Sequence, residues 1–296
     1  MSPPRLALFA LEALPNARAV RQFLVDHAAE IAFVGLSNAE RPKAGGLFGQ
    51  IGRHVRRSGL SILPYLIVNF GLPDLSTALF PLLGRLAPHP TPVSGTPLRT
   101  LCERHGIPVI RVDDVNGVEV ADAFAAHRPD LIVSFHFDQI FSATTLMLAP
   151  LGGVNVHPSL LPRHRGPVPT VHALAEDPHA FGVTVHRLVA DIDAGAILEQ
   201  EAATLPPGTS ASGASVLLHE RGRRLLDHVL ATIARDGMPP GRLVPRLPYC
   251  PFPDAALLRS LRRRGRRVTD AHDLSDALRL NGFSPRKDMR SPSKGA

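Results

Sequence analysis

Short apolar runs alternate with amphipathic stretches along most of this sequence. Apolar residues three or four positions apart indicate a helix, whereas a short unbroken apolar run bounded by turn residues indicates a buried strand. We therefore predict strands over residues 5–14, 31–36, 108–112, 131–137, 154–157 and 181–190, and helices over residues 16–29, 98–105, 118–127 and 211–236. Ser210 and Gly237 are suitable caps for the last helix. Strands that alternate with helices pair in parallel, so the predicted fold class is α/β, a mostly parallel sheet flanked by helices.

Residues 43–96 interrupt this alternation with an apolar insertion. Between Ser58 and Pro73 there is no charged residue, and nine of these sixteen residues are Leu, Ile, Val, Phe or Tyr. One interpretation is a helical hairpin packed on the core. A second is a lid or interfacial element over residues 58–84 that contacts a membrane surface or receives a lipid-linked substrate. The arginines that flank it would then lie beside anionic headgroups: Arg53, Arg56, Arg57 and Arg85. A third is the apolar interface of a homodimer.

A membrane-spanning helix is not expected in the insertion. Such a helix needs about 20 predominantly apolar residues in succession. Four residues interrupt the stretch: Pro64, Asn69, Pro73 and Asp74. The amino-terminal apolar run, residues 6–14, ends without a small-residue cleavage site, so no signal peptide is expected. The two cysteines, Cys102 and Cys250, are too few for a disulfide framework, which favours a cytoplasmic protein.

The composition is that of a globular protein, but the charge is unevenly placed. Of the 296 residues, 44% are hydrophobic and 20% are charged, which suits one large domain with an appendage. The net charge is +7, and the residues from 242 onward hold thirteen of the 33 basic residues but only five of the 26 acidic ones. The densest cluster, residues 259–267, is either a contact for nucleic acid or a solvated face. We favour the solvated face, because no aromatic residues are interleaved to stack on bases.

Polar residues gather at one of the expected strand ends. Asn155 and His157 lie two positions apart at the end of a strand, so their side chains share one face. In an open α/β sheet the carboxyl ends of the strands are where ligands bind. After the strand over residues 181–190, an acidic loop holds Asp191 and Asp193. An amide, an imidazole and a carboxylate that converge at such an edge can move an acyl group onto an amine.

Three motifs in this region resemble those of the 10-formyltetrahydrofolate-dependent formyltransferases: Asn-x-His-x-Ser-Leu-Leu-Pro at residues 155–162, Gly-Val-Thr-Val-His at 182–186 and Asp-x-Asp-Ala-Gly at 191–195. That group includes glycinamide ribonucleotide, methionyl-tRNA and amino-sugar formyltransferases, and the resemblance is strongest over residues 128–207. Ordered motifs at the right separation arise by chance far less often than one short pattern. The resemblance implies a Rossmann-like formyltransferase fold and a transferase of one-carbon metabolism, with 10-formyltetrahydrofolate as co-substrate.

The resemblance also implies roles for individual residues. Asn155 would hydrogen-bond the formyl oxygen and stabilise the developing oxyanion, which is typically worth ~3 kcal/mol. His157 would assist proton movement in the tetrahedral intermediate, and Asp193 would orient or charge-stabilise His157. The residues implied for the folate are Ser134, Phe135, His136, Phe137, Ile140, Asp191 and Ile192. Those implied for the acceptor are Ser159, Arg163, Arg165 and Gly166. The fourteen histidines match no metal-ligand spacing, so no metal site is expected.

Two departures from the family bear on the acceptor. The first strand is followed by Leu11-Glu-Ala-Leu-Pro rather than by a glycine-rich turn that could cradle a phosphate, which disfavours glycinamide ribonucleotide. About 50 residues follow Pro245, against the ~100 that a carboxyl-terminal β-barrel of a methionyl-tRNA formyltransferase usually needs. We therefore expect a small amine acceptor, such as an amino sugar or a biosynthetic intermediate. The alternatives are methionyl-tRNA and hydrolysis of 10-formyltetrahydrofolate to formate.

The expected organisation follows from these observations. Residues 1–241 are the catalytic domain, which contains the insertion over residues 43–96. Residues 242–283 are a short basic extension, in which Tyr-x-x-Phe-Pro at residues 249–253 resembles the extension of some formyltransferases that do not act on tRNA. Residues 284–296 are expected to be a disordered tail.

Overall fold

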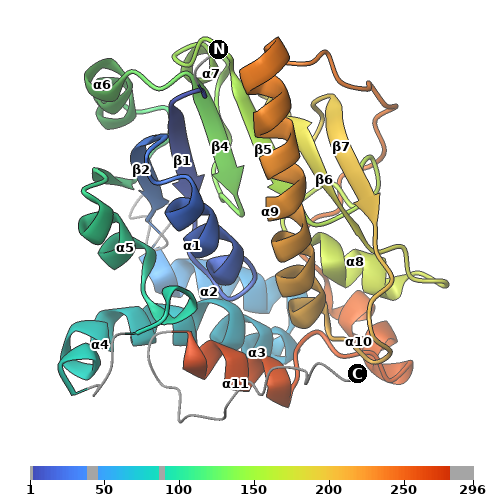
Figure 1. Ribbon diagram of the computed structural model, residues 1–296. Helices are drawn as coiled ribbons and strands as arrows, with labels where there is room; N and C mark the ends of the chain where they lie inside the picture. Colours follow the sequence, from blue (N-terminus) through green and yellow to red (C-terminus); the bar gives the residue numbers. More distant parts are fainter. Residues whose placement is uncertain (1–2, 39–45, 87–90, 281–296) are drawn as a thin grey trace, which may run out of the picture.

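The computed structural model describes residues 3–38, 46–86 and 91–280 of the chain. Seven strands form one sheet in the order β3-β2-β1-β4-β5-β6-β7 (Figure 1). Their bounds are β1 (Leu6–Ala10), β2 (Ile31–Ser37), β3 (Val109–Val112), β4 (Leu131–Phe135), β5 (Gly153–His157), β6 (Gly182–Arg187) and β7 (Ile197–Ala202). The pairs from β3 to β5 are parallel, and β6 and β7 are added antiparallel. The predicted fold class is confirmed.

Helices cover both faces and the carboxyl ends of the strands. They are α1 (Ala17–Asp26), α2 (Gly46–Ser58), α3 (Leu63–Leu66), α4 (Leu72–Leu86), α5 (Leu98–His105), α6 (Val118–His127), α7 (Ala143–Leu146), α8 (Pro169–Ala175), α9 (Ala211–Asp236), α10 (Ala255–Arg263) and α11 (Ala271–Arg279). The predicted bounds of α5, α6 and α9 are confirmed to the residue. Helix α9 begins where the Ser210 hydroxyl accepts from the backbone N–H of Gly213 and ends at Gly237, whose φ is 81°.

Other bounds differ from the prediction where the chain turns. The first strand ends at Ala10 rather than at residue 14, and β4 ends at Phe135 because His136 adopts a left-handed backbone with φ of 49°. Strand β7 and helices α7, α8 and α11 were not predicted. Three of the six residues of β7, which lies at the edge of the sheet, are Glu or Gln, so it lacks the apolar run that identifies a buried strand.

The core lies on both faces of the sheet. Alternate residues of β1 enter two separate clusters: Leu6 and Leu8 pack toward α1 and α9, whereas Phe9 packs toward α6. All five residues of β1 are buried, as expected for a parallel strand covered on both sides. Burying one side chain of the size of Phe9 stabilises the fold by ~1.5–3 kcal/mol.

The insertion consists of α2 and a second helical run that are joined at Gly59, which has φ of 73°. The second run includes one π-helical turn, Ile67–Gly71, at which Asn69 is buried. The Asn69 amide donates to the Tyr65 carbonyl and to the Ser212 hydroxyl of α9, each at 2.8 Å. The bond to Ser212 attaches the insertion to α9, and the insertion lies at the carboxyl ends of β1 and β4 (Figure 1).

One helical run among the described residues, Leu60–Pro81, is long and apolar enough to cross a membrane by length and composition alone. The expectation that interruptions would prevent such a run was therefore wrong. Pro64 does not end the helix, because it stands in the first turn of α3, where no backbone N–H is needed. One third of the most apolar window of the run is buried, and that side packs on the core through Ile62, Tyr65 and Val68.

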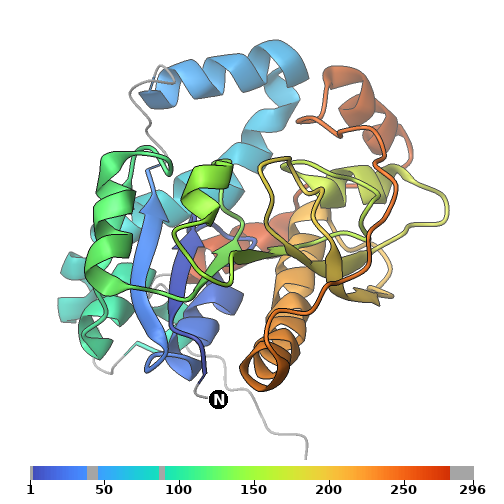
Figure 2. The ribbon, with the colours of Figure 1, turned by 90° about the horizontal axis from the view of Figure 1, so that it is seen from above.

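The carboxyl-terminal segment packs against the insertion through helix α10. Helix α10 lies beside α2, on the side of the sheet opposite to α9 (Figure 2). Arg264 donates to the Ala175 carbonyl, and Arg266 donates to the Leu174 carbonyl and pairs with Asp177. Two arginines of the basic cluster at residues 259–267 thus connect the end of α10 to the end of α8. The other arginines of this cluster are exposed. The expected tail, residues 284–296, and the Arg85 side chain lie outside the described residues.

Candidate active site

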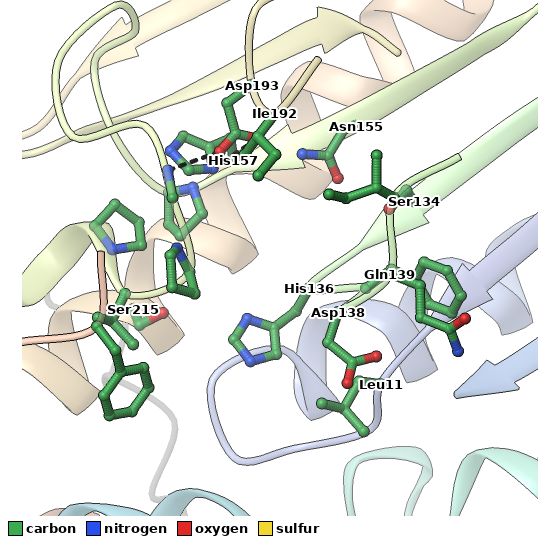
Figure 3. A pocket seen from close by; sticks show the side chains of 18 of the residues that line it. Leu11, Ser134, His136, Asp138, Gln139, Asn155, His157, Ile192, Asp193 and Ser215 are labelled. Atoms are coloured by element: carbon green, nitrogen blue, oxygen red, sulfur yellow. Dashed lines mark hydrogen bonds and ion pairs between the residues drawn. The ribbon is translucent and has the colours of Figure 1, made fainter. Parts of the chain in front are cut away.

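A cavity of about 820 Å³ lies at the carboxyl ends of β1, β4 and β5, where an open α/β sheet binds ligands. Most of its walls come from five parts of the chain. These are the loop after β4, the loop after β5, the loop after β6, the helices of the insertion, and the segment with Tyr249, Pro251 and Phe252; Leu11 after β1 and Ser215 of α9 complete the lining. Figure 3 shows Asn155, His157 and Asp193 gathered in this cavity, with Ser134 near the end of β4 and His136 and Asp138 on the loop after it.

Asn155, His157 and Asp193 are brought together, although 36 residues separate the last two. The Nδ1 atom of His157 lies 3.6 Å from Oδ1 of Asp193. The Nε2 atom of His157 lies 3.2 Å from the carbonyl oxygen of His164 and donates to it. Because that donation fixes the tautomer, Nδ1 of the neutral ring keeps its lone pair on the side of the Asp193 carboxylate.

Burial keeps His157 neutral. The side chain is 95% buried, and this lowers the pKa of His157 below its ordinary 6.5, because the cation would lose its hydration. The Asp193 carboxylate opposes this effect only in part. Burial alone would raise the pKa of Asp193. The interactions of the carboxylate with His157, with His186 and with the backbone N–H of Gly166 outweigh burial, and they hold the pKa of Asp193 well below its ordinary value.

His186 is a further member of the cluster. Its Nδ1 donates to the Arg187 carbonyl at 2.9 Å, so its Nε2 accepts from the Asn155 amide at 3.1 Å. This contact orients Asn155 so that its Nδ2 nitrogen is identified as a donor. In the sequence His186 closes the Gly-Val-Thr-Val-His motif, but no individual role was predicted for it. The signal that could have found it is its place in the register of the sheet, directly across from Asn155 in the β5–β6 pair.

The loop that carries Asp193 is held from two directions. The backbone N–H of Gly166 donates to Oδ2 of Asp193 at 2.8 Å, and the Arg165 guanidinium donates to the Ile192 and Leu247 carbonyls. Asp193 itself has φ of 46°, a left-handed conformation that costs a non-glycine residue ~1–3 kcal/mol. The structure therefore imposes on Asp193 a backbone conformation that places its carboxylate beside two histidines.

Most of the residues expected to bind the folate line the cavity: Ser134, His136, Phe137, Ile140, Asp191 and Ile192. Phe135 does not, and this prediction was wrong. Its side chain is fully buried on the opposite face of the strand and packs against Phe23 of α1. Burial lowers the pKa of His136 to about 4, with Asp138 opposing, so this ring is neutral as well.

Of the residues expected to bind the acceptor, only Gly166 lines the cavity. The buried Ser159 hydroxyl donates to the Arg163 carbonyl, and Arg163 is an exposed partner of Glu176. Arg165 holds the loop as described above. In the structure these three residues make contacts within and around the turn after β5 and do not line the cavity, so their role toward the acceptor stays a prediction.

Sequence analysis assigned no individual residue of the insertion to the cavity. The lining includes Ile51, His54 and Arg57 of α2, Tyr65 and Leu66 of α3, and Ile67 and Phe70 of the π turn. Tyr249, Pro251 and Phe252 close the cavity from the other side, and the rings of His54 and Phe252 lie 4.1 Å apart. The available signals were the uncharged stretch from Ser58 to Pro73 and the Tyr-x-x-Phe-Pro motif.

No group of three or more His, Cys, Asp or Glu side chains among the described residues could hold a metal ion. The turn after β1 is filled by the chain itself. One carboxylate oxygen of Glu12 accepts from Nε of Arg21 at 2.7 Å and from the backbone N–H of Leu98 at 3.0 Å. An anionic side chain thus occupies the turn after β1.

Comparisons with known proteins agree with this geometry. Residues 100–230 match the model of the formyl transferase family, a range that includes Asn155, His157 and Asp193. Methionyl-tRNA formyltransferase of Chloroflexus aggregans is 35% identical over 139 residues, which are 47% of this chain and 45% of that protein. That of Thermotoga maritima is 34% identical over 39% of this chain and 37% of its own length. The chain thus spans less than half the length of these relatives.

Solved structures share the fold. Phosphoribosylglycinamide formyltransferase of Bacillus halodurans superposes with a TM-score of 0.52 at 19% identity, over 78% of this chain and 96% of that one. A sugar N-formyltransferase of a Shewanella species superposes with a TM-score of 0.51 at 16% identity, over 94% of this chain and 89% of that one. At these identities the likeness concerns the fold alone.

Proposed function

We propose that this chain, whose residues 100–230 are those of a formyl transferase, transfers the formyl group of 10-formyltetrahydrofolate to an amine nitrogen. The observation that carries the proposal is the position of His157. Its Nδ1 faces the Asp193 carboxylate while Asn155 stands beside it in the same cavity. Acyl transfer without a covalent enzyme intermediate requires a base, a charged partner for that base and a hydrogen-bond donor to the oxyanion.

The first step is attack of the amine on the formyl carbon. The carbonyl oxygen gains negative charge as the new C–N bond forms. The Asn155 amide, oriented by His186, donates to that oxygen. A donor placed at a developing oxyanion is typically worth ~3 kcal/mol in the transition state. No covalent bond to the enzyme is needed.

The second step moves a proton and releases the product. The attacking nitrogen becomes positively charged and transfers a proton to Nδ1 of neutral His157. The imidazolium that results is stabilised by Asp193 at 3.6 Å. His157 then gives the proton to N10 of the folate as the bond between N10 and the formyl carbon breaks. General acid–base catalysis of this kind contributes ~10²–10⁴ in rate.

The residues present fit a folate on the β4 side of the cavity. The loop of residues 134–140 and the loop that includes Asp191 and Ile192 face each other across it. Phe137, Ile140 and Leu188 give this part an apolar lining in which a pterin ring can be enclosed. The folate supplies the activated formyl group, and these side chains hold it beside His157.

For the acceptor we propose a small molecule with an amine rather than a tRNA. The curated relatives are named for methionyl-tRNA, but Tyr249, Pro251 and Phe252 line the cavity together with the insertion, and its volume of about 820 Å³ suits a small molecule. Both cysteines are free, as suits the cytoplasmic location that we propose.

The test is turnover of 10-formyltetrahydrofolate by the purified chain, measured as release of tetrahydrofolate with and without a pool of amine metabolites. We expect release that depends on the pool and falls by ~10² or more in Asn155→Ala and Asp193→Asn. Arg163→Gln, which changes an exposed side chain outside the cavity, serves as the matched control. Release without any amine would identify a hydrolase instead, and absence of folate binding would overturn the proposal.

A further inference from the structure

The second helical run of the insertion exposes an apolar stripe. Its members recur every three or four positions and are all exposed: Leu60, Pro64, Ile67, Gly71, Leu75 and Ala78. The exposed fractions of Leu60, Ile67 and Leu75 are 71%, 52% and 57%. Asp74 is the only charged residue between Leu60 and Pro81. A contiguous apolar surface of this kind usually marks an interaction site.

The stripe continues into the cavity. Ile67 and Gly71 belong to the exposed stripe and also line the cavity. Behind them the lining is formed by Leu66 and Phe70 of the same run and by Ile51 of α2. Apolar side chains therefore continue from the surface of the insertion into the cavity that also holds His157, and the charged Arg57 and Asp74 line the cavity beside them.

Positive charge lies next to the stripe. Helix α2 carries Arg53, Arg56 and Arg57 and no acidic residue. Arg57 also lines the cavity, and its Nε donates to the Phe252 carbonyl at 2.5 Å. Apolar residues beside a basic helix face are the combination that lies on an anionic lipid surface.

We infer that the acceptor is an amphiphile, a primary amine attached to a hydrocarbon chain, which the enzyme takes from an anionic lipid surface on which the stripe rests. The inference rests on the proposed formyl transfer and names its substrate class. The chain of the amphiphile lies along Ile67, Phe70 and Ile51, so that its amine reaches His157. The new bond forms between the amine nitrogen and the formyl carbon, the bond to N10 breaks, and the amine proton passes through His157 to N10.

The continuity of the surface and the cavity favours a lipid over a protein partner. A second copy or another protein would cover the stripe, but it would not require an apolar lining inside the cavity. A phosphorylated soluble acceptor would need several cations around the phosphate, whereas Arg57 is the one Lys or Arg among the described residues that lines the cavity. The turn after β1 is occupied by Glu12, which pairs with Arg21.

The first experiment varies the chain length of the acceptor. Turnover of 10-formyltetrahydrofolate is measured with butylamine, octylamine and dodecylamine. Each buried CH₂ is worth about fourfold in binding, so we expect kcat/KM to rise by ~10² from butylamine to octylamine. In Ile67→Asp the increase in kcat/KM from butylamine to octylamine should be at least ~10-fold smaller, because a charged side chain then lies where the hydrocarbon chain of the acceptor would bind. Met147→Asp is the matched control, since Met147 is 74% exposed but lies outside both stripe and cavity.

The second experiment uses vesicles of three parts phosphatidylcholine to one part phosphatidylglycerol. We expect the chain to sediment with them, Leu75→Asp to lower the vesicle affinity by ~10-fold, and Met147→Asp to leave it unchanged. Light scattering of the same variants reports the oligomeric state. A dimer that Leu75→Asp dissociates, together with no vesicle affinity, would show a self-interface and overturn the inference.

Binding of 5-formyltetrahydrofolate separates the two levels of the argument. If this folate binds and turnover is independent of chain length, the amphiphile is excluded while formyl transfer stands. If the folate does not bind at all, the proposed function fails, and the inference fails with it.

Discussion

His157 directs its two ring nitrogens to different partners: Nε2 donates to the His164 carbonyl at 3.2 Å, and Nδ1 faces Oδ1 of Asp193 at 3.6 Å. The separation of 3.6 Å is longer than a hydrogen bond, as expected while the ring is neutral and both facing atoms are acceptors. When Nδ1 takes a proton, the contact becomes a hydrogen bond between ions. The pair thus interacts more strongly in the state that catalysis must reach than in the resting state.

Replacement of Asp193 by Asn tests this difference. The variant keeps the shape of the side chain but removes the charge that stabilises the His157 cation. We expect kcat to fall by ~10²–10⁴, with little change in folate affinity. Steady-state kinetics combined with a folate-binding titration measures both quantities. Equal losses in folate affinity and kcat would instead show that Asp193 only holds the loop.

The pH profile of kcat/KM gives an independent test. The base must be neutral, and burial lowers the pKa of His157 below 6.5. The acid-side loss of activity should therefore occur below pH 6.5, as His157 becomes protonated. Because the Asp193 charge raises the pKa of His157, Asp193→Asn should shift this limb to still lower pH. A shift toward higher pH would contradict the assignment.

The sequence predicted the centre of this site better than its walls. Asn155 and His157 follow an apolar strand, and the alternation of side chains along a strand places both on one face. Asp193 was identified by a motif, because no periodicity connects two loops that meet only in the folded sheet. Phe135 shows where prediction from the sequence fails. A strand that is buried on both faces does not alternate between polar and apolar residues, so its sequence does not indicate which side chain faces a cavity.

The insertion shows the same limit on a larger scale. Its apolar stretch indicated either a buried helix or an exposed interface. The helical run has one buried side, which includes Tyr65, and one exposed apolar side, which includes Leu60. Which side faces the core depends on Asn69, whose amide contacts Ser212 of α9. A contact between residues 143 positions apart leaves no local signal in the sequence.

Two histidines, the buried His219 and the partly buried His136, should make folding stability depend on pH. Burial lowers the pKa of His136 to about 4 and that of His219 to about 3. The unfolded chain therefore binds protons below pH 6.5 that the folded chain does not, and stability falls as the pH drops from 6.5 toward 4. The expected slope is at most ~1.4 kcal/mol per pH unit for each histidine. Urea unfolding at a series of pH values measures it, and His219→Gln should reduce the slope. An unchanged slope in that variant would argue against a buried, neutral His219.

Gly166 should tolerate no side chain. A Cβ atom there would lie 2.2 Å from the Cys250 carbonyl oxygen, and φ is 127°. We expect Gly166→Ala to destabilise the fold by at least ~2 kcal/mol and to weaken activity, because the Gly166 N–H donates to Asp193. Gly52 lies in α2 with no atom near its Cβ position, so Gly52→Ala should stabilise by ~0.5–1 kcal/mol. Thermal unfolding of both variants checks the pair, and equal melting temperatures would refute the packing argument.

The contributions of Glu12 and Arg21 to the free energy of unfolding should be coupled. Arg21 is 99% buried, and its guanidinium contacts the Glu12 carboxylate at 2.6 Å and donates to the Ser94 and Leu280 carbonyls. Removing the carboxylate leaves a cation in a buried position, which typically costs ~3–5 kcal/mol. We expect Glu12→Ala to destabilise by about this amount, and the double variant Glu12→Ala with Arg21→Met to be less unstable than the sum of the two single ones. Denaturant unfolding of all four proteins in the cycle measures the coupling. Additive effects would show that the carboxylate in this turn does not serve to hold Arg21.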